Sequence, residues 1–454
     1  MYYDLTRGKI SRSLILFALP MIAGNLLQQF YNIADTLIVG RVLGSNALAA
    51  VGSSYTLMTF LTSIFLGLSM GTGALFSIYQ GRKDLSSLKL SILHAFLLIL
   101  AVTLVLNLAV YAGIEPILTF LRVPDEVRPG MRTYLLIIFA GLIATSVYNF
   151  FSCMLRALGN SSVPLIFLAV SAVLNIALDL LFVAVLPFGI AGAALATVLA
   201  QYVSAVGILL YVLLRCRMWL PSKKEWRFSH SILKEILNLS SMTCIQQSVM
   251  NFGILMVQGL VNSFGPAVMA AFAAAVKIDT FAYLPVQDFG NAYSTFTAQN
   301  YGAGKPDRIW MGIKSATLMM TVYVIAIGAL MWGLAGKFAL LFISPDETEI
   351  IDDTALFLHI NTSFFFLLGM LSILRYTIQG AGYTRLAMFS GVSEMVARVL
   401  VSLIAVPLWG FWGVCFGDPT AWLFANLFLI PAFIYVYRRL QRVVVKEGRV
   451  VANS

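Results

Sequence analysis

The sequence predicts an all-α, polytopic membrane protein in which twelve transmembrane helices form two six-helix bundles related by a pseudo-two-fold axis. Composition is the first reason, because 60% of the 454 residues are hydrophobic, 11% are charged and the mean hydropathy is +0.88, far above that of a soluble protein. The second reason is that apolar runs long enough to cross ~30 Å of hydrocarbon recur along the whole chain. The third is an internal repeat.

The predicted spans are apolar stretches separated by short polar loops. Clear examples cover residues 14–39, 137–155, 163–186 and 190–214, each long enough for a transmembrane helix. Residues 1–12 are polar, and the apolar run that follows them is longer than the hydrophobic part of a signal peptide and lacks a small-residue cleavage site. We therefore expect that no segment is removed from this end.

The net charge of +10 is best explained by membrane topology. Most Lys and Arg residues fall in loops on one side of the predicted membrane, above all in residues 215–234 and 438–449. With both termini in the cytoplasm, this is the positive-inside distribution. We expect a multi-pass protein of the plasma (cytoplasmic) membrane of a prokaryote, which contacts membrane lipids and no nucleic acid.

Landmark residues of the first half return in the second half after 219 to 223 residues. The pairs are Asn32 with Asn251, Gly40 with Gly259, Gly81 with Gly302, Gly159 with Gly382, Pro187 with Pro407, and Gly192 with Gly413. We expect an amino-terminal lobe at 1–218, a cytoplasmic linker at 219–235, and a carboxy-terminal lobe with a basic tail at 236–454. Because six spans are an even number, both lobes enter the membrane in the same sense, and alternating access would rock one lobe against the other.

Polar side chains interrupt three predicted spans of the first half. Asn175 and Asp179 are four residues apart and therefore lie on one face of the fifth span. Asp35, late in the first span, and Thr197, early in the sixth, fall at a similar depth when ~1.5 Å is counted per residue. Carboxylates inside a membrane usually mark an ion or substrate path, so we expect these side chains to converge in one pocket.

All four side chains offer oxygen, which suits a hard cation, and none offers the sulfur or imidazole that a transition metal prefers. Two close carboxylates in a low-dielectric pocket cannot both remain ionised without a counter-charge, so the site is expected to take up either H+ or Na+. Interhelical hydrogen bonding alone is the alternative explanation. It applies better to Asn175 and Thr197 than to the two acids.

These motifs resemble those of the multidrug and toxic compound extrusion (MATE) family, and in particular its DinF-like branch. The resemblance covers residues 12 to about 439. It depends on a first span that runs from Pro20 to Asp35, on the Asn175-x-x-x-Asp179 pair, on Gly192-Ala-Ala-Leu-Ala-Thr197, and on the polar loops at 80–84 and 300–307.

The resemblance implies a site for H+ or Na+ formed by four side chains and one backbone carbonyl, those of Asp35, Asn175, Asp179, Thr197 and Ala193 respectively. It also implies that Tyr134 lines the same pocket and that Pro20 is a point where the first helix is straight or bent. A static kink explains a proline in this span equally well.

The second half departs from this pattern. The NorM-like branch of the family has acids on its seventh and tenth spans, whereas residues 243–250 and 361–374 contain none here. The repeat interval instead puts Arg398 at the position of Asn175 and Asp418 at that of Thr197. We predict a structural ion pair between Arg398 and Asp418, with Glu394 one helical turn from Arg398 as a second partner. A direct part in coupling is the alternative role.

Three more charged residues, Lys277, Asp279 and Asp288, lie in the eighth predicted span, and spacing does not assign their partners. Asp288 is a candidate residue of the substrate cleft, because an acid that faces such a cleft would attract cationic compounds. A hydrogen-bonded structural acid is an equally good interpretation of this residue.

Together these features predict a secondary-active exporter, an antiporter that couples inward flow of H+ or Na+ to the extrusion of amphipathic, cationic organic compounds. The sequence contains no Gly-rich phosphate-binding loop with Lys-Ser or Lys-Thr. The energy is therefore expected to come from an ion gradient, with no cofactor besides the coupling ion. Because both lobes belong to one chain, we expect a monomer.

Two alternatives stay open. A lipid or lipid-linked saccharide flippase of the same superfamily would also be polytopic and duplicated, but it would need a cationic cleft for phosphate, and the acids within spans outnumber the bases counted there, Lys277 and Arg398. A membrane-embedded enzyme would need a metal-binding Asp cluster or a nucleophile beside a base, and no predicted span supplies either. We therefore expect that the chain is not an enzyme.

Overall fold

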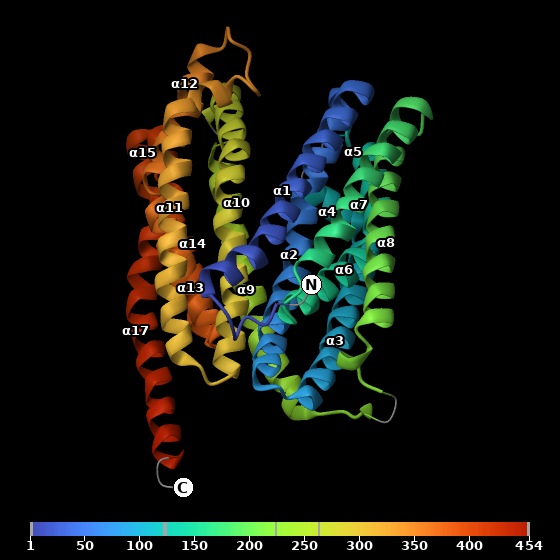
Figure 1. The fold of residues 1–454 in the computed structure, drawn as a ribbon. Helices are drawn as coiled ribbons and strands as arrows, with labels where there is room; N and C mark the ends of the chain where they lie inside the picture. Colours follow the sequence, from blue (N-terminus) through green and yellow to red (C-terminus); the bar gives the residue numbers. More distant parts are fainter. Residues whose placement is uncertain (1–2, 121–124, 223–224, 262–263, 452–454) are drawn as a thin grey trace. The chain divides into compact units, whose positions relative to one another are not determined.

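The computed structural model describes residues 3–120, 125–222, 225–261 and 264–451. Within these ranges the chain is helical without any β-strand, which confirms the all-α prediction (Figure 1). The elements in chain order are α1 (Ile10–Leu43), α2 (Ser45–Arg82), α3 (Leu85–Ala112), α4 (Ile114–Phe120), α5 (Arg128–Ala140), α6 (Leu142–Ala157), α7 (Ser162–Asp179), the π-helix η1 (Leu180–Val185), α8 (Gly189–Arg215), η2 (Arg217–Trp219), α9 (His230–Val261), α10 (Pro266–Gly302), α11 (Pro306–Ala339), α12 (Thr348–Ser363), α13 (Phe365–Gly380), α14 (Thr384–Leu400), the π-helix η5 (Val401–Ala405), α15 (Val406–Trp409), α16 (Phe411–Cys415) and α17 (Gly417–Val451).

Ten helices in the described part of the chain are long and apolar enough to cross a membrane. Two further spans each consist of a bent pair, since α5 and α6 meet at 44° and α12 and α13 meet at 48°. If each pair is one span, the total is twelve, as predicted. In the first pair the bend lies at Gly141, where a Cβ would come within 2.2 Å of Gln201 Oε1 on α8, so that the Gln201 side chain would have to move.

Contacts divide the chain into two units. Unit 1 contains Tyr3, Leu19–Gln80 and Asp84–Cys244, and unit 2 contains Asp4–Ala18, Gly81–Lys83 and the chain from Ile245 onward. The described residues of the segment expected as a linker, 219–222 and 225–235, therefore lie with unit 1 together with the first half of α9. The start of α1, up to Ala18, lies with unit 2.

Two of the four glycine pairs that reveal the repeat have the same structural roles in both halves. Gly159 and Gly382 follow α6 and α13 with φ angles of 89° and 84°, a left-handed conformation that favours glycine. A side chain at Gly192 would come within 2.9 Å of the carbonyl oxygen of Phe182 in η1, and one at Gly413 would come within 2.6 Å of that of Ala405 in η5. Each half thus repeats one helix-ending turn and one close approach to a π-helical carbonyl.

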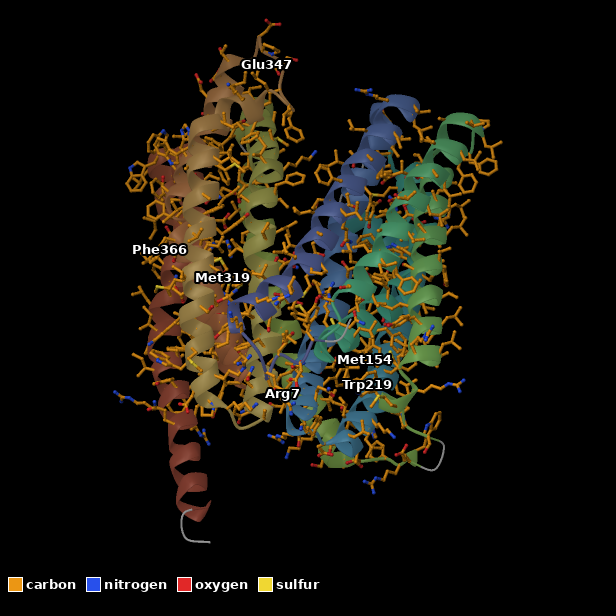
Figure 2. The ribbon with its side chains drawn as sticks, viewed as in Figure 1. Arg7, Met154, Trp219, Met319, Glu347 and Phe366 are labelled. Carbon is orange, nitrogen blue, oxygen red and sulfur yellow. The ribbon has the colours of Figure 1, made fainter. Side chains whose placement is uncertain are left out.

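The interior of unit 1 consists of two apolar clusters. One is formed around Phe76, Phe150 and Met154, with Trp219 packed against its edge (Figure 2). The other contains Phe65, Phe139 and Leu142 and lies against the buried alanines of α8. The second cluster therefore supports the helices α5 and α8, which carry polar residues of the candidate site.

Candidate functional site

Three helices of unit 1 bring the predicted polar residues together. Asn175 and Asp179 come from α7, Thr197 from α8 and Asp35 from α1. The Asn175 side-chain amide donates to Thr197 Oγ1 at 3.3 Å, and Thr197 Oγ1 donates to the carbonyl oxygen of Ala193 at 3.1 Å. The carboxyl groups of Asp35 and Asp179 interact with each other through charge and hydrogen bonding. Because Asn175 and Asp179 are one turn apart on α7, these two groups are neighbours, and the four side chains with the Ala193 carbonyl are called the unit 1 cluster below.

The local fold explains how α7 and α8 approach so closely. Ala193, Ala196 and Ala200 of α8 are all buried, and such small residues allow two membrane helices to pack at short distance. The Ser171 hydroxyl of α7 donates to the carbonyl oxygen of Ala200 at 2.9 Å. Asp179 is the last residue of α7 before the π-helix η1, and π-helical turns often occur at functional sites.

The cluster has more hydrogen-bond acceptors than donors. Asp179 is 0% exposed and Asn175 is 3% exposed. Apart from the mutual contact of the two acids, four of their buried oxygens receive no hydrogen bond from a described group: Asp35 Oδ1, Asn175 Oδ1, Asp179 Oδ1 and Asp179 Oδ2. Burying an unpaired carboxylate is costly. A bound cation or proton would satisfy these oxygens, so the donor set fits H+ or Na+.

The described residues contain no group of three or more His, Cys, Asp or Glu side chains that could hold a metal ion. The unit 1 cluster has only two such residues, and its other oxygens come from an amide, a hydroxyl and a carbonyl. Such a ligand set is suited to a hard cation and not to a transition metal.

Tyr134 and Pro20 lie at different distances from the cluster. Tyr134, on α5, is 7% exposed, and the charges of both Asp35 and Asp179 act on it. Pro20 lies on α1, about 22 Å along the helix axis from Asp35 at ~1.5 Å per residue. The structure therefore brings Tyr134 to the cluster and leaves Pro20 away from it.

Unit 2 contains a buried network of charged residues at the corresponding helices. Arg398 of α14 donates through Nη2 to Asp418 Oδ1 of α17 at 2.9 Å and through Nε to the same atom at 3.1 Å. Its Nη1 lies 3.6 Å from Glu394 Oε2, one turn away on α14. The structure thus joins the three residues for which the sequence predicts a structural ion pair.

The sequence interpretation missed a fourth member of this network, Arg375, which it did not count among the bases within spans. Arg375 lies within α13, is 4% exposed, and forms an ion pair with Glu394. Its Nε donates to Ser390 Oγ at 3.0 Å, and its Nη1 approaches Met250 Sδ at 3.5 Å. A signal was present, because Arg375 is the only Lys, Arg, Asp or Glu between Asp353 and Arg385.

The three charged residues of α10 have separate surroundings. Lys277 is exposed, with its ammonium 5.9 Å from the centre of the Phe342 ring. Asp279 interacts by charge with Asp418, and its Oδ1 is buried without a hydrogen bond from a described group. Asp288, the candidate for a substrate cleft, is 2% exposed and acts by charge on Tyr376 of α13. Asp279 therefore borders the charged network, whereas Asp288 lies in the interior of unit 2.

Comparisons with known proteins place this arrangement in a family. The model of the MatE family matches residues 20–181 and 240–404. The probable multidrug resistance protein YpnP of Bacillus subtilis is 30% identical over 438 residues, covering 95% of this chain and 96% of that protein. The multidrug export protein MepA of Staphylococcus aureus is 24% identical over 455 residues, covering 99% of this chain and 98% of that protein.

Solved structures show the same fold. A MATE protein crystallised in complex with MaL6 superposes with a TM-score of 0.89 at 22% identity and covers 98% of this chain and 99% of its own. A MOP superfamily transporter from Pyrococcus furiosus superposes with a TM-score of 0.88 at 22% identity, covering 96% and 97%. At this level of identity the likeness establishes the fold alone.

Proposed function

Because this multi-pass membrane protein belongs to the MatE family, we propose that it is a secondary-active multidrug exporter, an antiporter driven by inward flow of H+ or Na+. The relatives reported above are named for multidrug resistance and export and not for catalysis, so the membrane-embedded enzyme is set aside. The proposed substrates are amphipathic, cationic organic compounds. The proposed location is the prokaryotic plasma membrane, with both termini in the cytoplasm and a monomer as the working unit.

The observation that carries this proposal is the excess of acceptor oxygens in unit 1. Asp35 and Asp179 contact each other, and each has a buried oxygen that no described donor reaches. Two carboxylates in such surroundings repel each other until a proton or a metal cation arrives. The site therefore supplies what an ion-driven exporter needs, a position whose occupancy changes the charge inside the membrane.

Ion binding does work only if the cation binds one conformation more tightly than the other. Neutralising the two acids removes their repulsion, which changes how α1 can pack against α7. A change from 1% to 99% of one state requires a ~10⁴-fold difference in cation affinity. A gradient of the cation can then favour the conformation that releases substrate outward.

The charges of the interior favour cationic substrates over the phosphate groups of a flippase substrate. Arg375 adds a third base to Lys277 and Arg398, which corrects the count made from sequence. However, both buried guanidinium groups are held by acids, Glu394 and Asp418. Neither arginine is therefore available to bind phosphate in this structure.

The proposal can be tested in proteoliposomes with ethidium, a cationic amphipathic dye, under an imposed Na+ or pH gradient. Wild-type protein is expected to move ethidium in the direction opposite to the flow of one of these ions. The gradient that drives this movement identifies the coupling ion. Asp35→Asn removes one carboxylate from the pair and is expected to abolish gradient-driven movement. Asp346→Asn is the matched control, because it removes the same charge from an exposed loop.

Two results would contradict the proposal. Ethidium movement by wild-type protein that does not depend on either gradient would exclude the proposed antiport. Full gradient dependence in Asp35→Asn would exclude the unit 1 cluster as the ion site.

A further inference from the structure

The start of the chain alternates between the two units. Tyr3 belongs to unit 1, residues Asp4–Ala18 belong to unit 2, and the chain from Leu19 to Gln80 belongs to unit 1 again. The helix α1 runs without interruption through the second changeover. Its start, up to Ala18, is therefore held by unit 2, whereas the longer remainder carries Asp35 in unit 1.

A single arginine holds the segment that precedes α1. Arg308, in the first turn of α11, donates to three backbone carbonyl oxygens of this segment. Nη2 reaches Arg7 O at 2.7 Å, Nη1 reaches Gly8 O at 2.9 Å, and Nε reaches Leu5 O at 3.3 Å. Hydrogen bonds from a charged donor are the stronger kind, and the planar guanidinium fixes its donors in one geometry. Arg308 therefore sets the path of the chain before α1.

Two residues near Arg308 donate further hydrogen bonds to the same segment. The side-chain amide of Asn300, which is 0% exposed, donates to Leu5 O at 3.1 Å. Lys305 Nζ donates to Thr6 O at 3.0 Å. Leu5 itself is 0% exposed, so the segment is anchored by a buried apolar side chain as well as by its carbonyls. Arg308, Asn300 and Lys305 are called the clamp below.

Glycines make the clamp possible. Gly8 has a φ of 72° and Gly304 has a φ of 65°, which are turns that other residues adopt at a cost. A side chain at Gly312 would collide with the ring of Phe296. That ring lies under the Arg308 guanidinium at 5.7 Å, a cation–π distance. The loop at 300–307, which the sequence marks as a repeated feature, thus belongs to a binding surface for the chain's own start.

The contact continues along α1 itself. Ser11 Oγ and Ser315 Oγ are hydrogen-bonded at 2.6 Å and join α1 to α11 within unit 2. Leu14 and Phe17 are both 0% exposed. Pro20 follows directly after the changeover at Ala18, and a proline removes one backbone hydrogen bond inside a helix. The helix is thus fixed before this point and can bend at it.

The second repeat shows the same exchange with different chemistry. The first half of α9, up to Cys244, lies with unit 1 and its second half lies with unit 2. Side chains at Gly67 and Gly71 of α2 would collide with the backbone of Cys244 and Ser240, so this helix half is held by close packing of the small-xxx-small kind. In each repeat, the first helix starts on one unit and ends on the other.

We propose that the clamp holds the start of α1 on unit 2 throughout the transport cycle, and that Arg308 is a positioning residue which links unit 2 to the helix that carries Asp35. This inference rests on the proposed function, because it explains how occupancy of the unit 1 cluster reaches unit 2. When unit 2 moves, the clamped start of α1 moves with it, and the rest of α1 then shifts Asp35 relative to Asp179. Arg7, within the clamped segment, and Glu347, before α12, lie near opposite ends of unit 2 (Figure 2), so the clamp acts at one end of that unit.

Arg308→Gln removes the guanidinium and is the first test. Loss of three charge-assisted hydrogen bonds is expected to lower the maximal rate of gradient-driven ethidium movement at least about tenfold. The KM for ethidium and the binding of H+ or Na+ are expected to stay as in wild type, because the clamp touches neither. Arg227→Gln is the matched control, since it removes the same charge from an exposed position between α8 and α9.

A disulfide provides the second test. Ser11→Cys with Ser315→Cys places two thiols where the hydroxyls now touch. In an otherwise wild-type background the oxidised pair is expected to transport normally, because the clamp stays closed. Added to Arg308→Gln, the oxidised pair is expected to restore the rate, and reduction is expected to remove it again. Ser11→Cys alone, treated with the same oxidant, shows any effect of the native cysteines.

Each outcome decides the inference. Loss of transport on oxidising the pair in the wild-type background would overturn it, because α1 would then have to leave unit 2. If the disulfide fails to restore the transport rate of Arg308→Gln, and this variant melts at the same temperature as wild type, the inference is overturned as well. The yield of the Ser11–Ser315 cysteine disulfide measures closure of the clamp independently of transport, and Arg308→Gln is expected to lower this yield. Absence of gradient-driven transport in wild type would contradict only the proposed function.

Discussion

The two units treat buried charge in opposite ways at corresponding positions. In unit 1, Asp35 and Asp179 have oxygens that no described donor reaches. In unit 2, Arg398 lies at the repeat position of Asn175 and pairs with Asp418 and Glu394. One half thus has acceptor oxygens without a described donor, while the other half pairs its acids with guanidinium groups of its own side chains.

This difference separates two uses of the same framework. A guanidinium is a permanent part of the chain, so the charge of unit 2 stays constant and its helices stay joined. In the proposed function, by contrast, the charge of the unit 1 cluster changes when it binds a cation or proton. The comparison predicts that charge removal costs stability in unit 2 and costs transport in unit 1.

The largest effect is expected at Glu394. It is 2% exposed and contacts both Arg375 and Arg398, so Glu394→Gln leaves Arg398 with Asp418 and removes the acid that pairs with Arg375. Breaking a buried ion pair on one side costs about 3–5 kcal/mol. We expect the free energy of unfolding in detergent to fall by that order, measured by denaturant or thermal unfolding.

Glu349→Gln is a suitable control, because it removes an exposed acid of unit 2. The double variant Glu394→Gln with Arg375→Gln is expected to lose less unfolding free energy than the sum of the losses of the two single variants, since the unpaired charge is removed with its partner. An unchanged stability of Glu394→Gln would show that the network does not hold α13 and α14 together.

Much of this contrast was predictable because it depends on rare residues at regular spacing. Asp35 and Asp179 are conspicuous within apolar stretches, and the interval of the repeat led from Asn175 to Arg398. Helical periodicity then placed Glu394 beside Arg398. Local rules were sufficient wherever partners lie on one helix or at equivalent positions of the two halves.

The parts that were missed depend on contacts between distant segments. Arg375 lies near the end of an apolar stretch, and the sequence does not show that α12 and α13 bend at 48° or that Arg375 is buried beside Glu394. The start of α1 lies with unit 2 because Leu5 and Ser11 contact residues some 300 positions away. The first half of α9 lies with unit 1 because Gly67 and Gly71 of α2 allow close packing. No periodicity in either helix signals which unit will hold which half.

A smaller effect is expected for Asp179→Asn. Asparagine has nearly the same shape, removes the repulsion between the two acids, and adds an amide donor that Asp35 can accept from. We expect the free energy of unfolding at neutral pH to stay within about 1 kcal/mol of wild type, in contrast to Glu394→Gln. Gradient-driven ethidium transport is nevertheless expected to be lost. A loss of stability as large as that of Glu394→Gln would show that both units use their acids for structure.

The smallest effect is expected for an ion pair at the surface of unit 1, between Glu225 and Lys89 at 3.1 Å. The backbone amide of Ser222 and then the Lys89 ammonium lower the pKa of Glu225 from 4.5 to about 2. A carboxylate whose folded pKa is depressed stabilises the fold above its unfolded pKa, and this contribution is lost as the pH falls towards the folded pKa. The melting temperature of wild type is therefore expected to exceed that of Glu225→Gln slightly and constantly above pH 4.5, and the difference is expected to shrink between pH 4.5 and 2.

Added salt should reduce the difference in melting temperature between wild type and Glu225→Gln, because exposed pairs are screened. The loss of stability caused by Glu394→Gln in the interior of unit 2 should persist in salt. Equal salt sensitivity at both sites would mean that solvent reaches the network around Arg398, and the contrast between a paired, buried network in unit 2 and an unpaired cluster in unit 1 would fail.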